Sequence, residues 1–291
     1  MGNLSKSKVI GGIAMVVLIW GSVWPIYKIA LNYAPPILFA GLRSILAGLL
    51  FSTFLFRKWR KIRLKEVWHI YLISSIFNVI IFYGCQSIGL QYLPAGLFSV
   101  IVYLQPVLVV LLAWLWLKES LTTMKVVGII IGFLGVIFVS LEGITGKVST
   151  IGILLALITG IGWAIGTIYV KKKTTLVNGF WLVAIQNLIG GIFLFIVGMS
   201  IEETSSIKWN LPFIVTLLYG AIFGVTIAFL IYNKLMSAGE ASKVSSFTFL
   251  VPLISVLIGT LFLNEAFTLS LLVGMILILG SIFMINRKRI S

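Results

Sequence analysis

The stretch AGLFSVIVYLQPVLVVLLAWLWLKES at residues 95–120 returns later in the chain as ASKVSSFTFLVPLISVLIGTLFLNEA at residues 241–266. The two copies are 146 positions apart, so Pro106 aligns with Pro252 and Glu119 with Glu265. Each copy leads into a glycine-containing apolar run, VVGIIIGFLGVIFVS at 126–140 and LLVGMILILGSIFM at 271–284. The chain is therefore predicted to use one structural unit twice.

The repeat extends to the earlier part of each half, with a slightly different spacing. Trp20 aligns with Trp163, and Gly48 with Gly191, at a spacing of 143 positions. The tetrapeptides IFNV at 76–79 and IFGV at 222–225 align at the spacing of 146. We therefore predict two repeat domains, 1–146 and 147–291, that together form one unit.

The composition is that of a chain that spans a membrane repeatedly. Hydrophobic residues make up 60% and charged residues 10%, with a mean hydropathy of +1.16, whereas soluble domains have about 45–50% apolar and about 25% charged residues. Apolar runs of about 20 residues, the length that crosses a hydrocarbon core, recur along the chain. We predict ten transmembrane helices, near 9–31, 36–56, 67–90, 95–117, 124–141, 150–170, 179–199, 211–235, 241–263 and 268–285.

The positions of the basic residues predict how the chain is oriented in the membrane. With a cytoplasmic N-terminus, the clusters at 57–65, 171–173 and 287–289 all face the cytoplasm, and only Lys147 and Lys208 lie in outer loops. The positive-inside rule then places both termini in the cytoplasm. The formal charge of +15 is thus assigned to orientation in a cell membrane and not to a nucleic-acid partner. Because five helices is an odd number, the second half must be inverted relative to the first.

Three motifs carry a resemblance to a known family: WGSVWPIYKIAL at 20–31, LRSILAGLLF at 42–51 and PAGLFSVIVYLQPVLVVLLAWLWLKESLT at 94–122. In this order they resemble the EamA family of the drug/metabolite transporter superfamily, over essentially all ten helices. The resemblance implies a ten-helix transporter with a central cavity lined by helices 1, 3, 4, 6, 8 and 9. It also implies export of amino acids or other small metabolites.

The residue inventory argues against an enzyme and against a bound cofactor. The chain has no Asp, one His and one Cys, and its seven Glu residues fall in loops or at helix ends. No pair of buried carboxylates and no metal-ligand cluster can be assembled from these residues. The lack of a midplane carboxylate leaves facilitated diffusion, exchange and a less obvious proton coupling open.

Polar and aromatic side chains within the apolar runs are the candidates for a substrate pocket. Singly, each is better explained by helix packing or by an interfacial position. As a set they suit a small zwitterion or a partly aromatic metabolite. The predicted pocket residues are Trp20, Trp24, Asn78, Tyr83, Gln86, Tyr103, Trp163 and Tyr232, with Gln105, Tyr169 and Asn187 in the same group.

Charged residues within or beside the spans are candidates for gating. Arg43 lies about two turns into helix 2 and cannot lose its proton, so it needs partners. It either pairs with carbonyls or with Glu265 at the outer side, or it anchors a substrate carboxylate or phosphate. Lys28 is expected to snorkel to the interface.

Prolines and glycines predict where helices bend and where they touch. Pro25, Pro106 and Pro252 are expected to kink their helices, because proline removes a backbone hydrogen bond. The faces carrying Gly128, Gly132, Gly135 and Gly274 are expected to form close helix contacts, with a homodimer interface as the alternative.

The sequence as a whole predicts a permease of the cytoplasmic membrane. It would export a small organic metabolite by rocking its two inverted halves around a midplane pocket. The alternatives are a transporter of drug-like or lipid-linked substrates and, from another class, an intramembrane enzyme.

Overall fold

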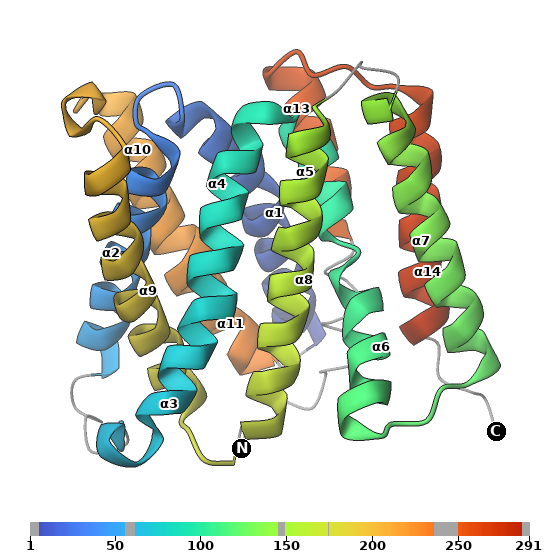
Figure 1. Cartoon of the computed structure of the whole chain (residues 1–291), viewed down its shortest axis with the longest axis horizontal. Helices are drawn as coiled ribbons and strands as arrows, with labels where there is room; N and C mark the ends of the chain where they lie inside the picture. The colour runs from blue at the N-terminus through green and yellow to red at the C-terminus, as the bar shows by residue number, and fades with distance from the viewer. Residues whose placement is uncertain (1–5, 56–61, 145–148, 174, 236–249, 287–291) are drawn as a thin grey trace. The chain divides into compact units, whose positions relative to one another are not determined.

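The computed structural model describes residues 6–55, 62–144, 149–173, 175–235 and 250–286, and within these ranges the chain is helical with no strands (Figure 1). The all-α class is therefore confirmed for the described residues. The helical elements are α1 (Lys6–Ala30), α2 (Pro36–Leu55), α3 (Leu64–Ser75), η2 (Ile76–Ile81), α4 (Phe82–Tyr92), α5 (Ala95–Val102), α6 (Gln105–Leu117), α7 (Thr123–Ile144), α8 (Thr150–Lys173), α9 (Gly179–Ile201), η3 (Thr204–Ser206), α10 (Leu211–Tyr219), η4 (Gly220–Ile227), α11 (Ala228–Leu235), α13 (Val251–Phe262) and α14 (Leu269–Asn286).

Among the described residues, seven helical segments are long and apolar enough to cross a bilayer, and three shorter apolar helices accompany them. The seven are Ser7–Ala30, Pro36–Leu55, Leu64–Tyr92, Ala95–Leu117, Thr150–Lys173, Gly179–Ile201 and Leu211–Tyr232. The shorter ones, Thr123–Phe138, Val251–Phe262 and Leu269–Met284, fall at the other three predicted spans. The first part of the predicted span 241–263 lies outside the described residues.

Two of the long spans contain a π-helical segment that the sequence pattern did not predict. The span Leu64–Tyr92 consists of α3, η2 and α4, and the span Leu211–Tyr232 passes from α10 through η4 into α11. The repeated tetrapeptides at 76–79 and 222–225 lie in η2 and η4. The same departure from α-helical geometry therefore recurs at equivalent positions of the predicted repeat. Such π-segments are rare and occur frequently at functional sites.

Of the three prolines proposed as kinks, one lies inside a helix and two lie in the first turn of one. Pro25 lies inside the continuous helix α1. Pro106 is the second residue of α6, just after the helix is interrupted at residues 103–104. Pro252 is likewise the second residue of α13. Proline is tolerated in a first helical turn because the N–H that it lacks has no acceptor within the helix there.

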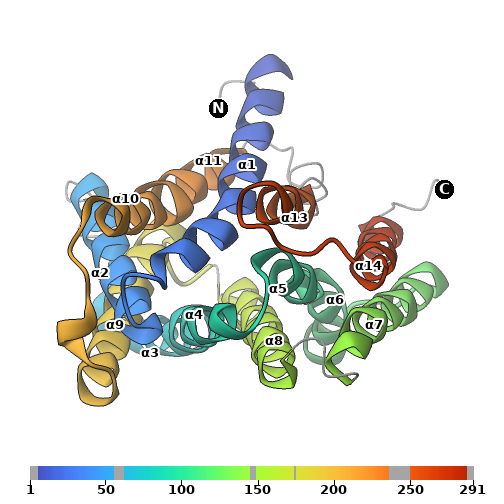
Figure 2. The ribbon, with the colours of Figure 1, turned by 90° about the horizontal axis from the view of Figure 1, so that it is seen from above.

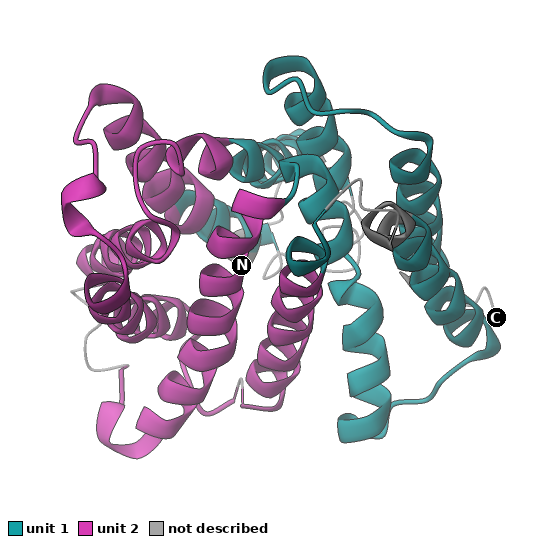
Figure 3. Cartoon of the chain, turned by 45° about the horizontal axis from the view of Figure 1, so that its top comes forward, with its two compact units in different colours: residues 1–25, 93–153, 227–291 teal, residues 26–92, 154–226 magenta. Residues whose placement is uncertain are grey.

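The chain divides into two compact units, coloured separately in Figure 3. Unit 1 comprises residues 1–25, 93–153 and 227–291, and unit 2 comprises residues 26–92 and 154–226. Each unit combines segments from both predicted sequence halves. The compact units and the repeat halves are therefore different divisions of the chain.

In unit 2, α2 and α9 lie side by side (Figures 1 and 2), and glycines on both helices make the contact close. A Cβ at Gly191 would lie 2.7 Å from the backbone nitrogen of Ile45, and one at Gly41 would lie 2.6 Å from that of Phe195. Small residues at helix contacts allow such an approach, and van der Waals packing is a main source of helix association in a bilayer.

In unit 1, α7 and α14 form the corresponding close pair (Figures 1 and 2). A Cβ at Gly135 would lie 2.9 Å from the carbonyl oxygen of Gly274 and 2.8 Å from Ile278. Ser281 Oγ donates a 2.5 Å hydrogen bond to the carbonyl of Gly128. These glycines are thus used for contact between two helices of the same chain.

The first turn of α2 has a cap that comes from a distant part of unit 2. The helix begins at Pro35 and Pro36, which offer no capping side chain. Its second and third residues, Ile37 and Leu38, donate backbone hydrogen bonds of 2.9 and 2.8 Å to the two carboxylate oxygens of Glu202. A carboxylate there satisfies free N–H groups and interacts favourably with the helix dipole.

Candidate functional site

Arg43, on α2, is the most deeply buried charged side chain among the described residues of unit 2. It is 1% exposed. Its Cζ lies 3.9 Å from the centroid of the Tyr27 ring and 4.3 Å from that of the Tyr83 ring, with the Phe39 ring at 5.5 Å. Its Nη2 donates a 3.3 Å hydrogen bond to Gln86 Oε1. The guanidinium is therefore surrounded mainly by ring faces, which attract a cation electrostatically.

The space for Arg43 is provided by Gly220, the first residue of η4. A Cβ at this position would lie 2.8 Å from Arg43 Cδ and 2.8 Å from Tyr27 Cε1. Four elements of unit 2 therefore meet at the Arg43 side chain. They are α1 through Tyr27, α2 through Arg43 itself, α4 through Tyr83 and Gln86, and η4 through Gly220. One of the two π-helical segments is thus in direct contact with the buried cation.

A second polar group of unit 2 surrounds Asn78 in the other π-helical segment, η2. Asn78 Nδ2 donates a 3.1 Å hydrogen bond to Ser74 Oγ, which in turn donates to Gln186 Oε1 on α9. The Asn78 amide lies against Gly166 of α8, where a Cβ would be 2.6 Å from Asn78 Cγ. Buried polar oxygens without a hydrogen-bond partner among the described residues are Ser75 Oγ, Ser87 Oγ and Asn187 Oδ1.

The aromatic candidates of unit 1 gather on α1, α5 and α11. The Trp20 ring lies 5.6 Å from the Phe229 ring and 5.3 Å from the Tyr232 ring, between centroids. Trp24 is buried with its ring 5.9 Å from that of Phe98, and its Nε1 has no hydrogen-bond partner among the described residues. Tyr103 is buried at the interruption between α5 and α6.

The predicted pocket residues are divided between the two units. Trp20, Trp24, Tyr103 and Tyr232 belong to unit 1, and Asn78, Tyr83, Gln86 and Trp163 belong to unit 2. Within unit 2 the structure brings Tyr83 and Gln86 together at Arg43, and it packs Trp163 on Phe82 at 5.2 Å between centroids. A single pocket that joins both groups stays a prediction.

Glu265 has a clear role within unit 1. Its carboxylate accepts hydrogen bonds from the backbone N–H groups of Ala95, at 2.5 Å, and Gly96, at 3.0 Å. It therefore caps α5, which begins directly after Pro94 and has no side-chain cap of its own. Arg43 and Glu265 belong to different units, so the pair proposed between them stays a prediction. Lys28 is half-buried in the last turn of α1.

Several residues that shape the site were missed by the sequence reasoning. Tyr27 and Gly220 complete the surroundings of Arg43, and Gly166 sets the position of Asn78. Glu202 could have been found, because a helix that starts at Pro35 and Pro36 without a capping residue needs an acceptor from elsewhere. Tyr27 carried no comparable signal, since tyrosines are common in membrane helices near the interface.

Metal chemistry has no support in the described part of the chain, where no group of three or more His, Cys, Asp or Glu side chains could hold a metal ion. The polar groups that converge there are a guanidinium, amides, hydroxyls and ring faces. Such groups bind and orient a molecule by hydrogen bonds, charge and stacking.

Comparison with known proteins gives consistent matches over nearly the whole chain. The uncharacterized transporter YvbV of Bacillus subtilis is 48% identical over 99% of this chain and 94% of its own length. The uncharacterized inner membrane transporter YedA of Escherichia coli K12 is 29% identical over 86% of this chain and 81% of its own. A chain in a solved crystal structure, 18% identical, superposes with a TM-score of 0.68 over 96% of both chains and shares the fold.

The model of the EamA-like transporter family matches the chain twice, at residues 7–141 and 150–287. Together these matches overlap every helical element described above. Family and relatives are transporters, not enzymes. The chain is a multi-pass membrane transporter that belongs to the EamA-like transporter family.

Proposed function

We propose that this transporter exports small organic metabolites, such as amino acids, across the cytoplasmic membrane by alternating access. The observation that carries this proposal is the polar interior of unit 2, where Arg43, Gln86, Asn78 and Gln186 lie within apolar helices. Polar and charged groups within membrane helices are costly to bury and mark transport pathways.

The proposed architecture is ten transmembrane helices in two inverted repeats, with both termini in the cytoplasm. It is supported by the two family matches and by the π-helical segments at equivalent repeat positions. Rocking is the proposed motion. The bodies that move are expected to be the compact units, because α2 with α9 and α7 with α14 tie the first half to the second by glycine contacts.

The test is a counterflow assay in liposomes that contain the purified protein. Radiolabelled amino acids and other metabolites are offered singly, and accumulation above protein-free liposomes is expected for at least one of them. Trp163→Ala is expected to weaken this transport, because Trp163 is one of the predicted pocket residues and its ring packs on Phe82 within unit 2. If no metabolite accumulates and the protein binds a lipid-linked precursor, the alternative of a lipid-linked substrate is favoured instead.

A further inference from the structure

Arg43 carries a full positive charge in a transmembrane helix without a carboxylate partner in the part of the chain that the structure describes. The ion pair found there is between Arg63 and Glu66. The other two described carboxylates of unit 2 are engaged as well, Glu202 with the first turn of α2 and Glu203 with Ser205. A buried guanidinium is normally paired with an anion, since ring faces and neutral amides compensate only part of the lost hydration.

The hydrogen bonding of this guanidinium is also incomplete. Nε has no hydrogen-bond partner among the described residues, and Nη2 has a long bond of 3.3 Å to a neutral amide oxygen. A carboxylate binds a guanidinium through two parallel N–H···O bonds, one to each oxygen. Gln86 Oε1 supplies one oxygen where a carboxylate would supply two. Of the two guanidinium nitrogens that would bind a carboxylate, Nη2 is therefore bonded to a neutral side chain and Nε has no partner among the described residues.

We propose that Arg43 and Gln86 form the binding site for a carboxylate group of the transported molecule. This proposal rests on the export function proposed above and specifies one chemical group of the substrate. The carboxylate takes Nε and Nη2 of Arg43, and the amide of Gln86 turns so that its Nε2 donates to the same group. Tyr27 and Tyr83 hold the guanidinium in place through their ring faces while the site is empty.

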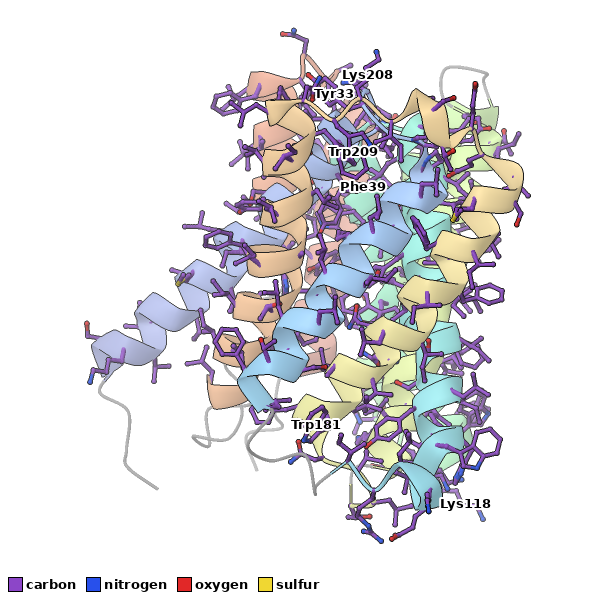
Figure 4. All side chains as sticks on the ribbon, turned by 90° about the vertical axis from the view of Figure 1, so that its left-hand side faces the viewer. Tyr33, Phe39, Lys118, Trp181, Lys208 and Trp209 are labelled. Atoms are coloured by element: carbon purple, nitrogen blue, oxygen red, sulfur yellow. The ribbon has the colours of Figure 1, made fainter. Side chains whose placement is uncertain are left out.

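A row of aromatic rings within unit 2 extends from an exposed tryptophan to the surroundings of Arg43. Trp209 is 62% exposed and its ring lies 5.3 Å from that of Phe213, which lies 6.4 Å from Phe39 beside Arg43. Figure 4 shows Trp209 at the same end of unit 2 as Tyr33 and Lys208, with Phe39 further in. Because Arg43 is almost fully buried, a ligand reaches it only when some of the side chains around it move.

The experiment compares acids with their own amides in a thermal-shift assay on the purified protein in detergent. The probes are L-amino acids and 2-oxo acids, each beside its primary amide, which removes the negative charge and keeps the skeleton. At least one acid is expected to raise Tm while its amide does not. Acid and amide shifts of equal size, a shift with inorganic phosphate alone, or no shift with any acid would overturn the carboxylate site.

Two variants test the residues themselves. Arg43→Lys keeps the charge but loses the fork, and is expected to weaken acid binding about 30-fold or more. Gln86→Glu gives Arg43 a carboxylate of its own, so it is expected to raise Tm without ligand and to abolish the acid shift. The control, Ser52→Ala, changes the same helix about two and a half turns away and should bind like the unchanged protein. Acid binding of unchanged strength in Arg43→Lys, or an acid shift that persists in Gln86→Glu, would contradict the proposal.

The outcome can be separated from that of the proposed function. In the counterflow assay, a neutral or cationic metabolite that is transported equally by Arg43→Lys would overturn this site and leave the export function standing. Acid binding that depends on Arg43, with no metabolite transported, would reject the export function and keep the binding site.

Discussion

At the scale of single residues, the carboxylate of Glu202 is expected to contribute to stability through α2. Glu202→Ala removes the acceptor of two backbone N–H groups in the first helical turn. Loss of such a cap lowers the free energy of unfolding by about 1–2 kcal/mol. The measurement is thermal or denaturant unfolding of the purified protein in one detergent.

The adjacent residue provides a matched control for this change. Glu203 is exposed, and its carboxylate accepts a hydrogen bond from Ser205 two residues away. Glu203→Ala should therefore leave stability within about 0.5 kcal/mol of the unchanged protein. If the two variants unfold at the same point, the cap on α2 does not contribute as described.

The sequence predicted that Arg43 is deep in a helix and needs partners, but it could not predict which ones. Depth follows from counting residues along an apolar run. The partners Tyr27 and Gln86 come from helices α1 and α4, whose rotation about their own axes depends on packing. In a bilayer both faces of a helix can be apolar, so hydrophobic periodicity gives little information about that rotation.

At the scale of helical elements, the contact between α2 and α9 is expected to be intolerant of even one added methyl group. In Gly191→Ala the new Cβ meets the backbone nitrogen of Ile45 and Cβ of Ser44, at 2.7 and 2.9 Å, and a backbone cannot yield as a side-chain end does. Overpacking of this kind lowers stability by about 1–3 kcal/mol. The readout is Tm in detergent.

Gly280→Ala, in α14, is the control for this prediction. A Cβ at Gly280 would meet open space, with no heavy atom of the described residues outside its own stretch of helix within 4 Å. The variant should therefore keep its Tm or gain slightly from the higher helix propensity of alanine. Equal losses in Gly280→Ala and Gly191→Ala would show that the effect does not come from the α2–α9 contact.

The contact between η2 and α8 can be tested by a double-mutant cycle. Gly166→Ala alone should be destabilising, because its Cβ overlaps the Asn78 amide. When Asn78→Ala is present as well, the overlap is gone, so the double variant should be more stable than the sum of single effects by about 0.5 kcal/mol or more. Strictly additive effects in unfolding measurements would contradict the described contact.

At this scale the sequence predicted the helical segments, which depend on the length of apolar runs, but not the π-helical segments, which depend on local backbone geometry. In the described part of the chain, seven of the predicted ranges coincide with helices long enough to span a membrane and three with shorter apolar helices, because run length and charge mark them. The π-helical segments η2 and η4 were not predicted, since the residues Ile, Phe, Val and Gly that form them are as common in α-helices of membranes. Even so, both copies of the motif IF-x-V adopt this geometry.

At the scale of the whole molecule, the charge pattern predicts which end of unit 2 faces the cytoplasm. Tyr33, Lys208 and Trp209 lie at one end of this unit and Trp181 at the other (Figure 4). In a Cys85→Ser background, Lys208→Cys should react with a membrane-impermeant maleimide in intact cells. Lys172→Cys should react only after the membrane is opened, because it belongs to the basic cluster at 171–173 that is predicted to face the cytoplasm.

Both introduced cysteines replace exposed lysines, so burial does not protect either of them from the reagent. Reaction of Lys172→Cys in intact cells, with Lys208→Cys protected, would reverse the proposed orientation. Labelling of both positions from outside would show that unit 2 does not cross the membrane between them.

The π-helical geometry of η2 has a mechanical consequence for the residues that follow it. A π-turn contains one residue more than an α-turn. If η2 converted to α-helix, the extra residue would join the following helix, and α4 would rotate by about 100° about its axis. The helix would stay continuous, but Tyr83 and Gln86 would both move away from Arg43 and lose the ring contact and the hydrogen bond to it. A change in the geometry of one helical turn would then decide whether Tyr83 and Gln86 contact the guanidinium.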